Sequence, residues 1–103
     1  MIKVKVAVTN NKIHSIAVTG HANGGPYGHD LACAAVSLVL TGGAGALKNI
    51  NDFDIRLNEG NGLIRLKENK ELSQHDEVVL ETINNQLVTL EKSYRNLIKI
   101  EIL

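Results

Sequence analysis

The sequence predicts an α+β fold, a two-layer sandwich with both helices on one face of a mostly antiparallel sheet. Five short segments alternate apolar with polar side chains, which is typical of strands that bury one face. Two longer segments, from Leu31 towards Lys48 and from Ser73 towards Asn96, have helical patterns. The predicted order is strand, strand, helix, strand, strand, helix, strand. Because each strand has a single apolar face, we expect both helices to cover that face.

The first two strands are predicted over residues 2–9 and 13–19. Asn10 and Asn11 lie between them, and asparagine tolerates the positive φ of a tight turn. We interpret His14, near this turn, as a partly exposed histidine that belongs to no site. The helix that follows is apolar nearly all round, so it needs cover from the second helix or from a partner subunit. Asp30 is a natural N-cap, which makes Leu31 the first helical residue.

A second hairpin is predicted from residues 53–58 and 63–67. Residues 59–62 form its turn, with the Asn61-Gly62 pair as the strongest signal. Residues 98–102 form the closing strand.

The second helix has recognisable end signals. Ser73 is the predicted N-cap, and Asp76 lies in the first turn, where a carboxylate complements the helix dipole. We interpret His75 as a solvated side chain, and we expect Asn96 to end the helix in a left-handed conformation.

Composition excludes several classes of protein. The chain has 103 residues and a formal net charge of zero, and no block of like charge argues for a nucleic-acid or membrane surface. We therefore expect one domain over residues 1–103, no direct nucleic-acid binding and no membrane span, because no segment reaches about 20 apolar residues. The first residues alternate like a strand and lack the apolar run of a signal peptide. With a single cysteine and hence no internal disulfide, the cytoplasm is the expected compartment.

The only cysteine lies at the predicted start of the apolar helix. If Asp30 caps that helix, Cys33 is its third residue, where unpaired N–H groups and the helix dipole favour the thiolate. His21 precedes the helix across a glycine-rich loop that can bring its imidazole to the sulfur. A cysteine nucleophile with a histidine base is therefore the first hypothesis.

Two other interpretations stay open on chemistry alone. Cys33 could be a buried core residue, because free cysteine is among the most buried residue types. His29 and Cys33 are four residues apart and His21 could join them around a metal. Structural zinc usually takes four ligands in tight pairs, however, so we expect neither a metal nor another cofactor.

The motif around the cysteine resembles that of a known family. The chain contains Gly20-His21-Ala22 and then Asp30-Leu31-Ala32-Cys33-Ala34-Ala35-Val36-Ser37. This resembles the ribosomal-processing cysteine protease family called Prp, which carries Gly-His-Ala, a glycine-bearing loop and an Asp-x-x-Cys-Ala-Ala-x-Ser helix start. The resemblance implies that Cys33 is the nucleophile of a cysteine endopeptidase and His21 its acid and base. The family's loop often has a lysine where this chain has His29.

Supporting roles follow for other residues of the motif. Asp30 either caps the helix or orients His21, and the two roles stay open. Ser37, one turn beyond Cys33, either supports the site or bonds to a helix carbonyl. His29 is the other candidate base. We expect the loop to fold over an extended substrate, and its members are Gly24, Gly25, Pro26, Tyr27, Gly28 and His29.

The substrate and the assembly are implied by the resemblance alone. It implies a protease that removes a short N-terminal extension from large-subunit ribosomal protein twenty-seven, after an apolar stretch that ends in aromatic residues. It also implies a homodimer, which agrees with the surplus apolar surface of the first helix. The alternative is a non-catalytic, ribosome-associated adaptor that binds a peptide with the same loop, or a small metal-binding domain. An adaptor has no need of an activated thiol, so thiol reactivity distinguishes the two.

Overall fold

The computed structural model describes residues 1–21, 29–58 and 60–103, with the backbone alone for residues 29 and 30. The strands are β1 (Ile2–Thr9), β2 (Lys12–Thr19), β3 (Phe53–Asn58), β4 (Asn61–Leu66) and β5 (Ile98–Ile102). The helices are α1 (His29–Ala46) and α2 (Gln74–Ser93), and a short 3-10 turn, η1 (Ile50–Asp52), precedes β3. This is the predicted order of elements.

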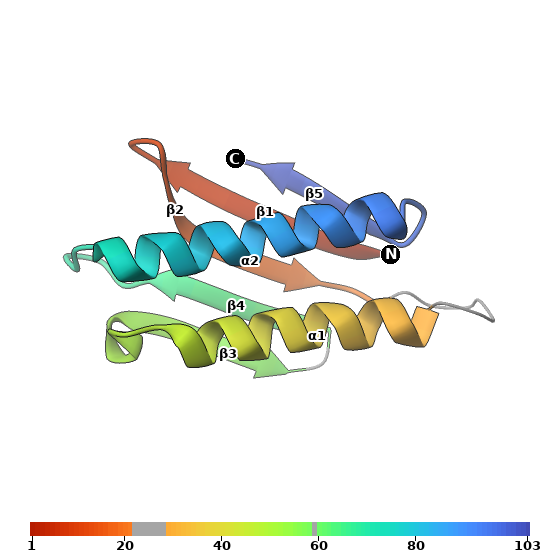
Figure 1. The fold of residues 1–103 in the computed structure, drawn as a ribbon, viewed down its shortest axis with the longest axis horizontal. Coiled ribbons are helices and arrows are strands. Elements are labelled where there is room, and N and C mark those ends of the chain that lie inside the picture. The colour runs from red at the N-terminus through yellow and green to blue at the C-terminus, as the bar shows by residue number, and fades with distance from the viewer. Residues whose placement is uncertain (22–28, 59) are drawn as a thin grey trace.

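The five strands form one sheet in the order β3-β4-β2-β1-β5. Neighbouring strands are antiparallel except β1 and β5, which run parallel. Both helices lie side by side on one face (Figure 1), α1 in contact with β3 and β4 and α2 with β2 and β5. The predicted two-layer α+β fold, mostly antiparallel, is confirmed. No helix in the described ranges is both long and apolar enough to cross a membrane.

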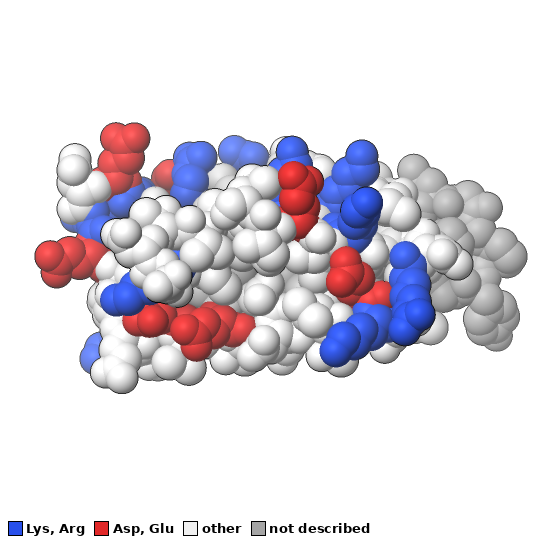
Figure 2. Space-filling view, turned by 90° about the horizontal axis from the view of Figure 1, so that it is seen from above, with Lys and Arg blue, Asp and Glu red and all other residues white. Residues whose placement is uncertain are grey.

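The core lies between the sheet and the helices. Each strand of the first hairpin buries alternate residues on the helix side, and α2 contributes one apolar face. The large apolar side chains that are almost fully buried are all aliphatic, as the scarcity of aromatics requires: Ile2, Val4, Val6, Ile16, Ile64, Leu80, Ile83, Leu87 and Ile98. Among the described residues the charged side chains other than Asp76 are at least partly exposed, and Figure 2 shows acidic and basic groups interspersed on the face seen from above.

Helix α1 begins at His29, two residues before the predicted start. The prediction that Asp30 is the N-cap and Leu31 the first helical residue is therefore wrong. Aspartate is favourable both at the cap and inside the first turn, because both places lie near the positive end of the dipole, so its presence does not fix the first residue. Cys33 is the fifth helical residue, and its N–H falls within the regular i to i−4 pattern.

The β3–β4 turn lies earlier than its strongest sequence signal. Asn61 is the first residue of β4 and pairs with Asn58, so the turn precedes Asn61 and includes Gly60, at φ +73°. Gly62 is instead buried inside β4, where a Cβ atom would come within 2.7 Å of Leu40 Cδ1. The second glycine of the Asn-Gly pair is thus needed for close packing of α1 on the sheet and not for the turn.

Two other predictions about asparagine have opposite outcomes. Asn10 and Asn11 adopt φ of 53° and 64°, which confirms the tight turn between β1 and β2. Asn96 does not adopt a positive φ, and α2 ends at Ser93, with the N–H of Tyr94 donating to the carbonyl of Leu90. The predicted left-handed end at Asn96 is therefore wrong.

A buried carboxylate joins the end of α1 to the start of α2. Asp76 is 1% exposed and accepts hydrogen bonds from the backbone N–H groups of Lys48, at 2.7 Å, and Asn49, at 3.0 Å. The Ser73 hydroxyl accepts from the Asp76 N–H at 3.1 Å, which confirms Ser73 as the N-cap of α2. His75 is exposed, as predicted, and its Nε2 lies 2.9 Å from the carbonyl oxygen of Ala46. We call this set of contacts the Asp76 clamp.

Candidate active site

His21 lies two residues after the last residue of β2, and its backbone is held from two sides. Gly20 adopts φ +87°, and a Cβ atom there would collide with the carbonyl oxygen of Met1, so the chain can turn this way only with glycine. The backbone nitrogen of Met1 donates to the His21 carbonyl at 2.7 Å. The Gly20 N–H donates to the Gly60 carbonyl at 3.1 Å. These contacts fix the position of the His21 backbone, from which the imidazole extends into the pocket.

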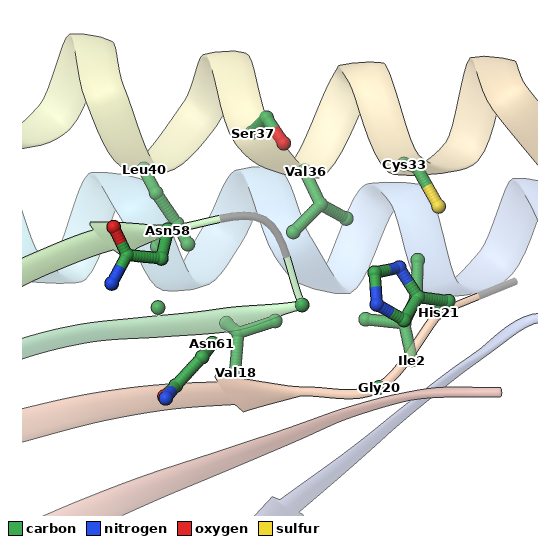
Figure 3. A pocket seen from close by; sticks show the side chains of 12 residues that line it. Ile2, Val18, Gly20, His21, Cys33, Val36, Ser37, Leu40, Asn58 and Asn61 are labelled. Atoms are coloured by element: carbon green, nitrogen blue, oxygen red, sulfur yellow. The ribbon is translucent and has the colours of Figure 1, made fainter.

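Cys33 comes from α1, on the opposite side of the same pocket. Its neighbour Ala32 is fully buried against the core, whereas Cys33 is partly exposed. Figure 3 shows the thiol and the His21 imidazole facing a common space from the helix and from the sheet. The interpretation of Cys33 as a fully buried core residue does not fit this exposure.

The pocket that these two side chains share is small. Its volume is about 30 Å³, which is room for a water-sized group and not for a large side chain. Its walls come from one end of the sheet and from α1: Ile2, Val18, Gly20, His21, Cys33, Val36, Ser37, Leu40, Asn58, Gly60, Asn61 and Gly62. A carbonyl group or a water molecule fits such a space next to the thiol.

A second hollow continues this pocket along α1. It is lined by Ser37, Leu40, Thr41, Leu57, Asn58 and Gly62, and four of these also line the first pocket. We call the two together the active-site groove. Leu57 on the edge strand β3 is 45% exposed there. None of the described residues that line the groove is Lys, Arg, Asp or Glu.

The structure brings some predicted site residues together and leaves others aside. Cys33, His21 and Ser37 line one pocket. Asp30 and His29 belong to the first turn of α1, but their side chains are outside the described residues. The other residues of the predicted substrate loop are also outside the described residues: Gly24, Gly25, Pro26, Tyr27 and Gly28.

The sequence did not indicate that the β3–β4 turn contributes to the site. Asn58, Gly60 and Asn61 reach the pocket because β4 pairs with β2, which sets Asn61 opposite Thr19, just before His21. No local pattern encodes that pairing. In the described ranges, no three His, Cys, Asp or Glu side chains gather as metal ligands. The absence of a metal stays a prediction.

Cysteine hydrolases use a thiol nucleophile and an imidazole base that lie close together. Here a partly exposed thiol and an imidazole share one pocket near the start of a helix. The fold and this site define that class of enzyme. Comparison with known proteins identifies the family, since the sequence model described as "Cysteine protease Prp" matches residues 1–99. The chain belongs to this family and is a cysteine protease.

Similarity to individual proteins extends over nearly the whole chain. The ribosomal processing cysteine protease Prp of Staphylococcus aureus strain Mu50 is 29% identical over 103 residues, 97% of each sequence. The crystal structure of the S. aureus Prp with a substrate peptide superposes with a TM-score of 0.83, at 29% identity, over 100% of both chains. The complex of that protease with a covalently linked product peptide gives 0.81 at 30% identity, again over 100% of both chains.

Proposed function

We propose that this protease uses Cys33 as nucleophile and His21 as acid and base to remove a short N-terminal extension from large-subunit ribosomal protein twenty-seven. The observation that carries the catalytic part is the shared pocket of the Cys33 thiol and the His21 imidazole. The name of the S. aureus relative, a ribosomal processing protease, supports the class of substrate.

The chemistry follows the general thiol mechanism. His21 takes the thiol proton, and the Cys33 thiolate attacks the peptide carbonyl to form a C–S bond. The tetrahedral intermediate collapses as the C–N bond breaks, and protonated His21 gives its proton to the leaving amine. His21 then takes a proton from a water molecule, whose oxygen attacks the thioester and releases the carboxylate and the free thiol.

The oxyanion of the intermediate needs N–H donors. The N–H of Cys33 is inside the regular hydrogen bonding of α1, because this residue is the fifth of the helix. The free donors of the helix are those of its first turn, at residues 29–31. We propose that donors preceding Cys33, in this turn or just before it, bind the oxyanion.

The lining of the active-site groove favours an uncharged, extended substrate segment. Its described lining is apolar or neutral, with Leu40 and Leu57 as its largest apolar side chains. A charged substrate side chain would find no opposite charge among these residues. We propose that cleavage follows a large apolar or aromatic residue, which packs on the exposed rim of the groove at Leu57, since the pocket beside the thiol has room only for a group the size of the scissile carbonyl.

The test is direct proteolysis. The protein is incubated with the ribosomal-protein precursor, and mass spectrometry follows the loss of the N-terminal extension. Wild type should release one N-terminal fragment, and Cys33→Ala should release none. A matched control is His14→Ala, since His14 lies in β2 and does not line the groove. An intact precursor with wild type would refute the assigned substrate, and cleavage by Cys33→Ala would refute the nucleophile.

Asp30 and Ser37 are proposed as supporting residues. Asp30 precedes Cys33 by three residues and Ser37 follows it by four, so both positions share its side of α1. If Asp30 orients His21, Asp30→Asn should lower kcat while the Tm stays close to that of wild type. If Asp30 only stabilises the helix start, stability and kcat should fall together. Ser37→Ala separates the same two roles for the hydroxyl.

We propose that the protein acts as a homodimer through the outer face of the helix layer. Leu38 on α1 is 73% exposed and Val78 on α2 is 53% exposed. They border a groove of about 420 Å³ between the helices, whose floor includes Gly42, Gly43 and Ile83. Sedimentation of wild type and of Leu38→Glu tests this: wild type should be dimeric and the variant monomeric. A monomeric wild type at micromolar concentration would contradict it.

A further inference from the structure

We infer that Gly60, in the β3–β4 turn, is a positioning residue that sets the orientation of the His21 imidazole. The inference rests on the role proposed above for His21. The turn reaches this histidine because β4 pairs with β2, with Gly62 opposite Val18 and Asn61 opposite Thr19. The strand register therefore leaves Gly60 beside the residues that follow β2.

The imidazole lies where a side chain of residue 60 would have to be. A Cβ atom on Gly60 would lie 2.7 Å from Cε1 and 3.2 Å from Cδ2 of His21, and closer still to Nε2. Carbon atoms in contact are ordinarily about 3.5–4.0 Å apart. The ring thus packs directly on the backbone of Gly60, which also lines the pocket.

Gly60 meets two separate demands. Its φ of +73° is one that asparagine also tolerates, as Asn10 and Asn11 show in the other hairpin. With the His21 ring in its present position only glycine fits, since every other L-residue carries a Cβ atom that would displace the ring. A turn alone would accept asparagine at this position, whereas a turn that supports the imidazole would not.

The ring gives way before the backbone does. The Gly60 carbonyl accepts the Gly20 N–H, and Asn61 is held in register by pairing with Thr19 on one side and Asn58 on the other. The imidazole, in contrast, turns about two single bonds. A side chain at residue 60 therefore displaces the ring from its present position in the pocket that it shares with Cys33 and leaves the fold in place. A misplacement of about 1 Å at a reacting group costs on the order of 100-fold in rate.

The experiment compares Gly60→Ala and Gly60→Asn with a matched glycine variant, Gly45→Ala. A Cβ atom on Gly45, in α1, meets nothing within 4 Å. Steady-state cleavage of a substrate peptide gives kcat and KM, and thermal unfolding checks the fold. Both Gly60 variants should lose about 100-fold in kcat with little change in KM, and Gly45→Ala should match wild type. Near-wild-type kcat in Gly60→Asn would mean that the residue serves the turn alone and would overturn the inference.

A double-mutant comparison separates this inference from the proposed function. Alkylation of Cys33 by iodoacetamide at pH 7 reports on the thiol without any substrate. Gly60→Asn should slow alkylation in the wild-type background and change nothing further when His21→Ala is already present. A further tenfold loss in that background would overturn the positioning role, as would loss of cooperative unfolding in both Gly60 variants. If His21→Ala keeps full turnover, the proposed function fails and the inference with it. If His21→Ala is inactive while Gly60→Asn is active, the inference alone fails.

Discussion

Removing the Asp76 carboxylate should destabilise the protein strongly without disabling the thiol. In Asp76→Ala the backbone N–H groups of Lys48 and Asn49 both lose their acceptor. Hydrogen bonds to a charged group contribute about 1.5–3 kcal/mol each. Because Lys48 and Asn49 lie near the surface, water replaces part of this, and we expect a total loss of about 3 kcal/mol. For a domain of this size the loss corresponds to about 12–24 °C in Tm.

Urea unfolding followed by circular dichroism measures the free energy of unfolding. Glu77→Ala is the matched control, because Glu77 is the next residue of α2 and pairs with Lys12 only at 3.6 Å on the surface. Such a pair is worth about 0–1 kcal/mol. Asp76→Asn should fall in between, since one acceptor oxygen is kept while the amide NH₂ opposes the other N–H. A loss below about 1 kcal/mol in Asp76→Ala would refute the role of the clamp. The clamp lies at the far end of α1 from Cys33, so the rate of Cys33 alkylation in the folded variant should equal that of wild type.

Four other outcomes are expected. Cys33→Ala should abolish proteolysis and leave the free energy of unfolding within about 1 kcal/mol of wild type, because alanine is common beside it in α1; a variant that loses cooperative unfolding would make Cys33 a core residue. His21→Ala should lower kcat by about 1,000-fold and His29→Ala far less, as steady-state kinetics can show; equal losses would contradict the choice of base. A chelator should leave activity and Tm unchanged, and zinc bound stoichiometrically would revive a metal site. Replacing the residue before the scissile bond by alanine should lower kcat/KM by about 100-fold, and equally fast cleavage after lysine or glutamate would disprove apolar selection.

Local sequence patterns predicted the helices and strands well, but they did not predict which residues make tertiary contacts. Alternation along β1 and β2 identified both strands and the face that they bury, because a half-buried strand has a fixed period of two. Asp76 has an ordinary position in a first helical turn, and only the tertiary contact with the end of α1 explains its burial. Gly62 likewise follows asparagine as in a turn, yet it is there for the packing of Leu40.

The candidate site divides along the same line. Cys33 and His21 were recognisable because the motif that carries them is continuous in sequence around one loop. Gly60 was not, because its nearness to His21 depends on the pairing of β4 with β2 and on a register that no short segment encodes. A residue that contributes to a site from a hairpin distant in sequence can therefore be identified only once the order and register of the strands are known.

The parallel pairing of β1 with β5 has a consequence for how the chain reaches its native state. Ile2 pairs with Ile98, so this contact joins the two most distant parts of the sheet along the chain. Closing so long a loop costs about 4 kcal/mol of chain entropy, which later contacts must offset. Until β5 docks, the edge of β1 has open hydrogen-bonding groups beside Val4 and Val6, and such an edge can pair with another chain. We therefore expect folding to be slow for a domain of this size. We also expect less aggregation when the protein is refolded at lower concentration.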